Sequence, residues 1–113
     1  MSKIYFNWRN LDMSLKRIWQ NIIKGWNDSD CWNLDYIIAK FILPRLKRFN
    51  ELIYSHPSTL TITEWHEVLN KMIFSFESII ENEEDFIEST EEREHKIQEG
   101  LYLFSKYFKH LWD

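Results

Sequence analysis

Four basic residues close together in the sequence are the strongest candidates for binding chemistry. They lie in KFILPRLKR, residues 40 to 48, and are Lys40, Arg45, Lys47 and Arg48. If this segment is helical, the four side chains span an arc of about 160°. Together with the flat ring of Trp32, they predict a surface that binds a small anionic ligand such as a nucleotide. The alternative is a solvated face whose cations balance nearby carboxylates, as is usual on surface helices.

Metal chemistry has a weaker basis in the sequence. Glu92 and His95 have the Glu-x-x-His spacing of di-iron proteins, but that site needs two such motifs and a Glu from each of two further helices. Because the sequence has one such motif, in a polar segment, a solvated helix start is the better interpretation. The acidic residues 81–94 contain no Gly and lack the ligand alternation of a calcium-binding EF-hand loop. The sequence therefore predicts no metal site.

Covalent and nucleotide-hydrolysing chemistries also lack their usual residues. A catalytic thiol needs a nearby base or a positive field, whereas Cys31 lies beside Asp28 and Asp30. The chain has only two Gly, and neither a P-loop nor the glycine pattern of a Rossmann fold is present. We therefore expect a protein that acts by binding, without a cofactor, and not an enzyme.

Composition indicates one domain of ordinary size. Hydrophobic residues make up 44% of the 113 residues and aromatic residues 17%, so a single helical domain over residues 1–113 can bury a substantial core. The formal net charge of −4 disfavours binding to duplex nucleic acid, which depends on Lys and Arg. The first ten residues contain no long apolar run, so we expect no signal peptide, and no stretch approaches the ~20 apolar residues of a membrane span. We expect a cytoplasmic protein without a membrane partner.

Helices must position these side chains, because two Gly and two Pro leave few tight turns for a β-sheet protein. The first expected helix covers about residues 11 to 24, with Asn10 as its N-cap and Gly25 at its end. The second covers about residues 30 to 54. Pro44 lies inside it and predicts a kink, because proline donates no backbone hydrogen bond and its ring displaces a carbonyl.

Two further helices are expected in the second half of the chain. Each follows a capping-box pattern, Thr61 with Glu64 and Ser89 with Glu92, and Thr63 is a competing N-cap for the first of these two helices. Gly100 lies mid-helix, where it costs about 1 kcal/mol against Ala, so we expect a neighbouring helix with a bulky residue such as Trp to approach it closely. The four segments predict an all-α fold, a four-helix bundle or a related compact helical array with a proline-kinked central helix.

The first half of the second expected helix is apolar nearly all round. Asp35 and Lys40 are the two charged residues between positions 34 and 43, and so apolar a segment is typical of a helix surrounded by others. A small bundle does not easily provide that much cover, so a symmetric homodimer is a second way to bury the segment.

The aromatic residues fall into two groups. One group lies on hydrophobic helix stripes and is expected in the core: Trp19, Trp65, Phe76, Phe104 and Phe108. The other lies at termini and turns, where exposed rings commonly anchor interfaces: Trp8, Trp26, Trp32 and Trp112.

Three segments resemble small helical proteins of unassigned function encoded by tailed bacteriophages. They are WNLDYIIAKFILPRLKRFNE (32 to 51), TEWHEVLNKMIFSFE (63 to 77) and QEGLYLFSKYFKHLWD (98 to 113). The resemblance implies a phage accessory protein made in the cytoplasm of a bacterial host, and phage accessory proteins often oppose host defences by binding a nuclease, a sensor or a nucleotide signal. The resemblance does not assign a functional role to any residue of this chain.

Three hypotheses of function follow. The first is a non-enzymatic accessory protein that binds a small anionic, nucleotide-like ligand on the second helix. The second is an inhibitor or assembly factor that binds a host protein through its acidic segment and exposed Trp rings. The third is a metal-dependent enzyme, which the missing ligands disfavour.

Overall fold

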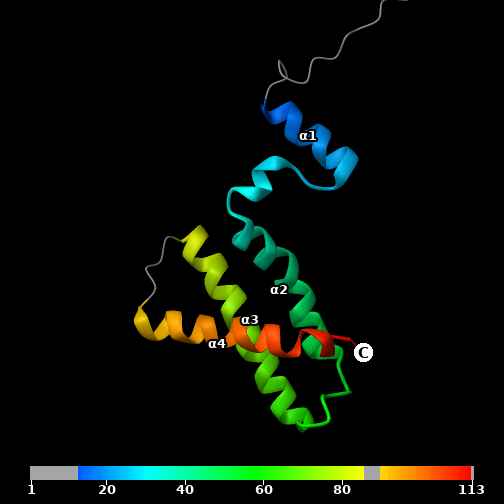
Figure 1. Cartoon of the computed structure of the whole chain (residues 1–113), viewed down its shortest axis with the longest axis vertical. Helices are drawn as coiled ribbons and strands as arrows, with labels where there is room; N and C mark the ends of the chain where they lie inside the picture. Colours follow the sequence, from blue (N-terminus) through cyan, green and yellow to red (C-terminus); the bar gives the residue numbers. More distant parts are fainter. Residues whose placement is uncertain (1–12, 86–89, 113) are drawn as a thin grey trace, which may run out of the picture. The chain divides into compact units, whose positions relative to one another are not determined.

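A computed structural model describes residues 13–85 and 90–112, and every regular element in these ranges is helical. The α-helices are α1 (Met13–Lys24), α2 (Leu34–Leu52), α3 (Ile62–Glu84) and α4 (Glu91–Tyr107), and the two 3₁₀ turns are η2 (Asp28–Cys31) and η3 (Phe108–His110) (Figure 1). The predicted all-α fold with four helices is therefore confirmed. None of the described helices combines the length and hydropathy that a membrane span requires.

The chain divides into two compact units, residues 1–34 and 35–113. In the described part of the first unit, Gly25 ends α1 with a φ of 81°, as predicted for a left-handed helix end. Asn27 caps η2 by accepting the Ser29 N–H at 3.0 Å, and the Gln20 side chain accepts the Asp28 N–H at 2.7 Å. Because these bonds favour a separate 3₁₀ turn, the second helix begins at residue 34 and not near residue 30. The predicted N-cap Asn10 lies outside the described residues.

In the second unit, local capping sets where α3 and α4 begin. Thr61 and Glu64 form the predicted capping box: the Thr61 hydroxyl accepts the Glu64 N–H at 3.1 Å, and the Glu64 carboxylate accepts the Thr61 N–H at 3.0 Å. At α4 the N-cap is Thr90, which accepts the Arg93 N–H at 3.1 Å. The predicted cap Ser89 lies outside the described residues.

The core of the second unit lies where α3 meets α2 and α4. Trp65 is fully buried, and its ring meets Tyr107 of α4 edge-on with 5.5 Å between centroids. Between α2 and α3, Asn50 donates to Asn70 at 2.9 Å, and Lys47 pairs with Glu77 at 3.0 Å. The buried cluster consists of Ala39, Leu46, Ile53, Trp65, Leu69, Met72, Phe76 and Tyr107.

Helices α3 and α4 approach most closely at Gly100. A Cβ atom at this position would overlap the Ser75 hydroxyl and the Lys71 carbonyl oxygen. Ser75 is fully buried, and its hydroxyl donates to the Ile97 carbonyl at 2.8 Å across the crossing. The predicted close approach at Gly100 is therefore confirmed, although the neighbour is a serine and the α3 backbone and not a Trp.

Several aromatic residues lie where the sequence predicts. Trp65 and Phe76 are buried, and Phe104 packs against the core. The three described Trp that were expected at the surface are exposed, namely Trp26, Trp32 and Trp112. Trp8 lies outside the described residues.

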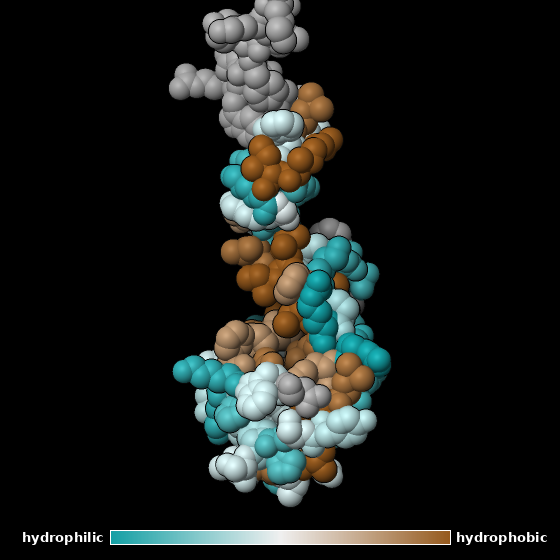
Figure 2. Space-filling view, turned by 90° about the vertical axis from the view of Figure 1, so that its right-hand side faces the viewer, coloured by the Kyte–Doolittle hydropathy of each residue, from teal (hydrophilic) through white to brown (hydrophobic). Residues whose placement is uncertain are grey.

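Two aromatic residues that were expected in the core are exposed. Trp19 is 46% exposed, since the described element that contacts α1 within its own unit is the short turn η2, and the burial of Trp19 against the other helices stays a prediction. Phe108 is 60% exposed, because the chain changes from α to 3₁₀ geometry there and its ring leaves the α4 stripe, keeping an edge contact with Phe104. Figure 2 shows hydrophobic side chains, in brown, on the surface of the molecule.

Within the second unit, the first half of α2 is not surrounded by other helices, and the prediction that all the helices together surround it stays a prediction. Ala39 is fully buried, but Ile38 is 49% and Phe41 59% exposed, because α3 covers one side of α2. Helix α2 continues without a break through Pro44. The kink at Pro44 and the packing of all four helices in one bundle stay predictions.

Candidate functional site

The outer face of α2 is an exposed stripe made of Ile38, Phe41, Arg45, Arg48 and Leu52. These residues recur at spacings of three and four, so they share one side of the helix. The buried residues Ala39 and Leu46 lie on the opposite side, against α3. The outer face therefore combines apolar side chains with two guanidinium groups.

Arg45 is the cation that is most closely joined to this apolar surface. Its guanidinium carbon lies 3.9 Å from the centroid of the Phe41 ring, and its Nη1 donates to the Phe41 carbonyl at 2.8 Å. Stacking on the ring and the hydrogen bond hold the guanidinium in one place, so less side-chain entropy is lost when a partner binds it.

The other three predicted cations have different partners. The ammonium of Lys40 lies 5.0 Å from the Tyr36 ring, whose hydroxyl donates to Glu84 of α3. The hydrogen bond to Glu84 raises the pKa of Tyr36. Lys47 and Arg48 form ion pairs, with Glu77 at 3.0 Å and Glu51 at 2.8 Å. Two of the four charges are thus offset by carboxylates.

Trp32 belongs to the first compact unit, where the Arg17 guanidinium lies 4.6 Å from the centroid of its ring. Its predicted cooperation with the four cations stays a prediction.

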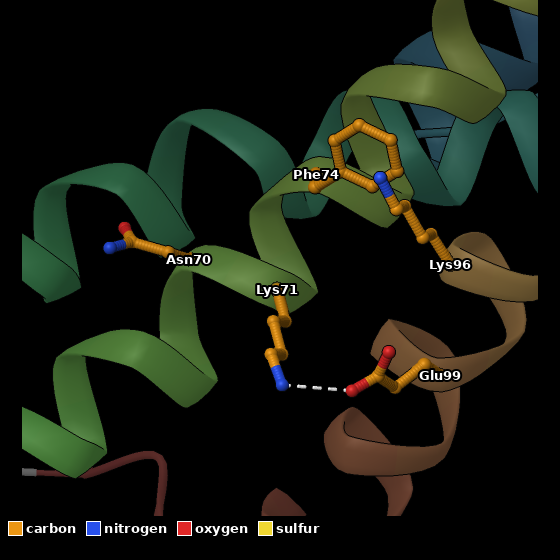
Figure 3. Close-up of a pocket in the computed structure, with 5 residues that line it drawn as sticks. All are labelled: Asn70, Lys71, Phe74, Lys96 and Glu99. Atoms are coloured by element: carbon orange, nitrogen blue, oxygen red, sulfur yellow. Dashed lines mark hydrogen bonds and ion pairs between the residues drawn. The ribbon is translucent and has the colours of Figure 1, made fainter. Parts of the chain in front are cut away.

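A concave site that the sequence analysis missed lies between α3 and α4. The α3–α4 groove has a volume of about 280 Å³ and is lined by Asn70, Lys71, Phe74, Lys96 and Glu99 (Figure 3). Its lysines both lie near carboxylates, Lys71 at 2.9 Å from Glu99 and Lys96 at 3.5 Å from Glu92. The one feature of the sequence that could have indicated this groove is Phe74. It is a large apolar residue that lies outside the hydrophobic stripe of α3, and its side chain is 39% exposed.

The Lys71–Glu99 ion pair should make the packing of α3 on α4 depend on pH. The hydrogen bond from Lys71 lowers the pKa of Glu99, and the same contact raises the pKa of Lys71. Glu99 thus stabilises the fold above its ordinary pKa of 4.5, and this effect is lost as pH falls through its lowered pKa. Lys71 stabilises the fold below its ordinary pKa of 10.5, and this effect is lost as pH rises through its raised pKa.

Urea unfolding of the wild type and Glu99→Gln measures this dependence. The stability difference between the two proteins should be largest between the two ordinary pKa values and should shrink on the acid side. High salt should also reduce it, because both side chains are exposed and screened. A difference that is constant from acid to neutral pH would show that the pair contributes no pH-dependent stability.

The predicted Glu-x-x-His motif has a different environment from that of a di-iron ligand. Glu92 pairs with Lys96, and both Glu92 and His95 line an open acidic surface on α4. Within residues 13–85 and 90–112, no three His, Cys, Asp or Glu side chains are grouped so that they could hold a metal ion.

Comparison of the chain with models of known protein families, with curated proteins and with solved structures found no match.

Proposed function

We propose that this chain is a non-enzymatic accessory protein of bacteriophage type that acts by binding a protein of its bacterial host. Its docking surface is the outer face of α2. The observation that carries this proposal is the exposure of Ile38 and Phe41 beside Arg45, which is stacked on the Phe41 ring.

The chemistry of this surface defines the partner. Large apolar side chains that gather at a surface are typical of interaction sites, and aromatic and Arg residues contribute most to the binding energy of interfaces. The two guanidinium groups favour carboxylates on the partner. The α3–α4 groove lies elsewhere, so an extended protein segment with apolar and acidic residues suits the outer face better than a small molecule does.

Capture from host lysate with matched variants tests this proposal. Phe41→Ser and Arg45→Glu should each reduce the amount of a specific captured protein about tenfold or more, because each change removes an anchor of the interface. Lys106→Glu is the control, since Lys106 also lies near an aromatic ring, at 5.4 Å from the centroid of Tyr107, but on α4. If Phe41→Ser and Arg45→Glu retain the same partner as Lys106→Glu does, the outer face is not the docking surface.

A small anionic, nucleotide-like ligand is the second candidate for α2. Its support is that Arg45 and Lys40 each lie near an aromatic ring, so that each cation has a flat surface beside it. A thermal-shift assay with a panel of nucleotides tests it, because a ligand that binds the folded state raises the melting temperature.

A homodimer through the outer face is the third candidate. Sedimentation of the wild type and of Phe41→Ser tests it, because the substitution should shift a dimer toward the monomer.

A further inference from the structure

We propose that the α3–α4 groove binds a small ligand that combines one flat apolar ring with one anionic group. This site is separate from the outer face of α2 and does not depend on the function proposed for that face. Its volume of about 280 Å³ is close to the lower end of the range for small-molecule sites.

The groove provides a place for each part of such a ligand. The Phe74 ring is 39% exposed, which leaves part of it for contact with a second ring. In Figure 3 Phe74 and Lys96 lie above the Lys71–Glu99 pair, with all four side chains around the same space. The apolar body of the ligand would contact Phe74, and its acidic group would lie between the two ammonium groups.

The charges favour an anion with one negative charge. Two ammonium groups and one carboxylate line the groove, so its lining is positive although the whole chain has a net charge of −4. Lys96 is the better anchor for the ligand, because its ion-pair partner among the described residues is Glu92 at 3.5 Å, and the Glu92 side chain is 82% exposed. A ligand anion can replace Glu92 there, since Glu92 stays hydrated. Glu99 remains beside Lys71 at 2.9 Å and repels a second negative charge.

Isothermal titration with four probes tests the class of ligand. Indole-3-acetate and cyclic adenosine monophosphate each carry a ring and a single negative charge, on a carboxylate and a phosphodiester respectively. Inorganic phosphate lacks the ring, and tryptamine replaces the anion by a cation. We expect at least one ring-bearing anion to bind about tenfold more tightly than phosphate and tryptamine. The better of the two ring-bearing anions identifies the acidic group.

Variants locate the binding within the molecule. Phe74→Ala and Lys96→Gln should each weaken binding about tenfold, and both side chains are exposed enough for the fold to survive their loss. Glu99→Gln should tighten anion binding roughly two- to fivefold, because it removes a negative charge from the groove. A residue with only a structural role would not produce this increase.

Lys106→Gln is the matched control, because Lys106 is also an exposed lysine beside an aromatic ring, 5.4 Å from the centroid of Tyr107, but does not line the groove. It should leave binding unchanged. The proposal is wrong if neither ring-bearing anion binds at millimolar concentration. It is also wrong if Lys106→Gln weakens binding as much as Lys96→Gln, or if Glu99→Gln weakens it.

Discussion

Gly100→Ala should destabilise the second unit by about 2 kcal/mol or more, although alanine is normally the better helix former by about 1 kcal/mol. The added methyl group would overlap the Ser75 hydroxyl and the Lys71 carbonyl oxygen, so α4 must move away from α3. For a domain of this size the melting temperature should fall by about 10 °C, which circular dichroism measures.

Two further variants identify the cause of that loss. Ser105→Ala makes another helix-favouring change in α4 at an exposed position, so it should be neutral or slightly stabilising. Ser75→Gly in the Gly100→Ala background removes one of the two clashing groups and should restore part of the lost stability. If Gly100→Ala melts at or above the wild-type temperature, the close crossing of the helices is not present in solution.

Trp65→Ala should cost about 3–5 kcal/mol, the largest loss that we expect from a single substitution in this chain. Trp65 is fully buried at the point where α2, α3 and α4 share one core, and it packs edge-on against Tyr107. Removing the indole ring leaves a cavity that affects all three helices. Urea unfolding followed by circular dichroism measures the loss.

Trp112→Ala is the control for this substitution. Trp112 is 69% exposed, so its removal should change stability by less than about 1 kcal/mol. Trp65→Phe provides a milder test in case the alanine variant does not fold. The buried Trp65 indole N–H has no hydrogen-bond partner among the described residues, so phenylalanine loses packing but no hydrogen bond. Equal stability of Trp65→Ala and Trp112→Ala would contradict the proposed core.

The features that the sequence predicted correctly depend on residues a few positions apart. The Thr61–Glu64 capping box joins residues three positions apart, and the left-handed Gly25 follows directly on α1. The stripe that contains Trp65 and Phe76 is a property of one helix, so its buried face was also predicted. Local geometry determines each of these features without reference to the rest of the fold.

The features that were missed depend on how helices meet. Whether Trp19 and Phe41 are covered depends on which element lies beside them, and an apolar pattern does not say so. The α3–α4 groove depends on contacts such as that of Lys71 with Glu99, which are 28 positions apart. The basic arc on α2 was visible from spacing alone, but its ion pair with Glu77 of α3 was not.

The contact of Gly100 with Ser75 also has a consequence for the evolution of the groove. Two helices that cross at one point of closest contact diverge on both sides of it, so a wedge-shaped space opens beside Gly100 and Ser75. The side chains of Lys71, Phe74 and Lys96 border this space. The volumes of residues 75 and 100 therefore set the width of the wedge. Substitutions among small residues at positions 75 and 100 can therefore change which molecules fit in the groove, while the residues that contact those molecules stay the same.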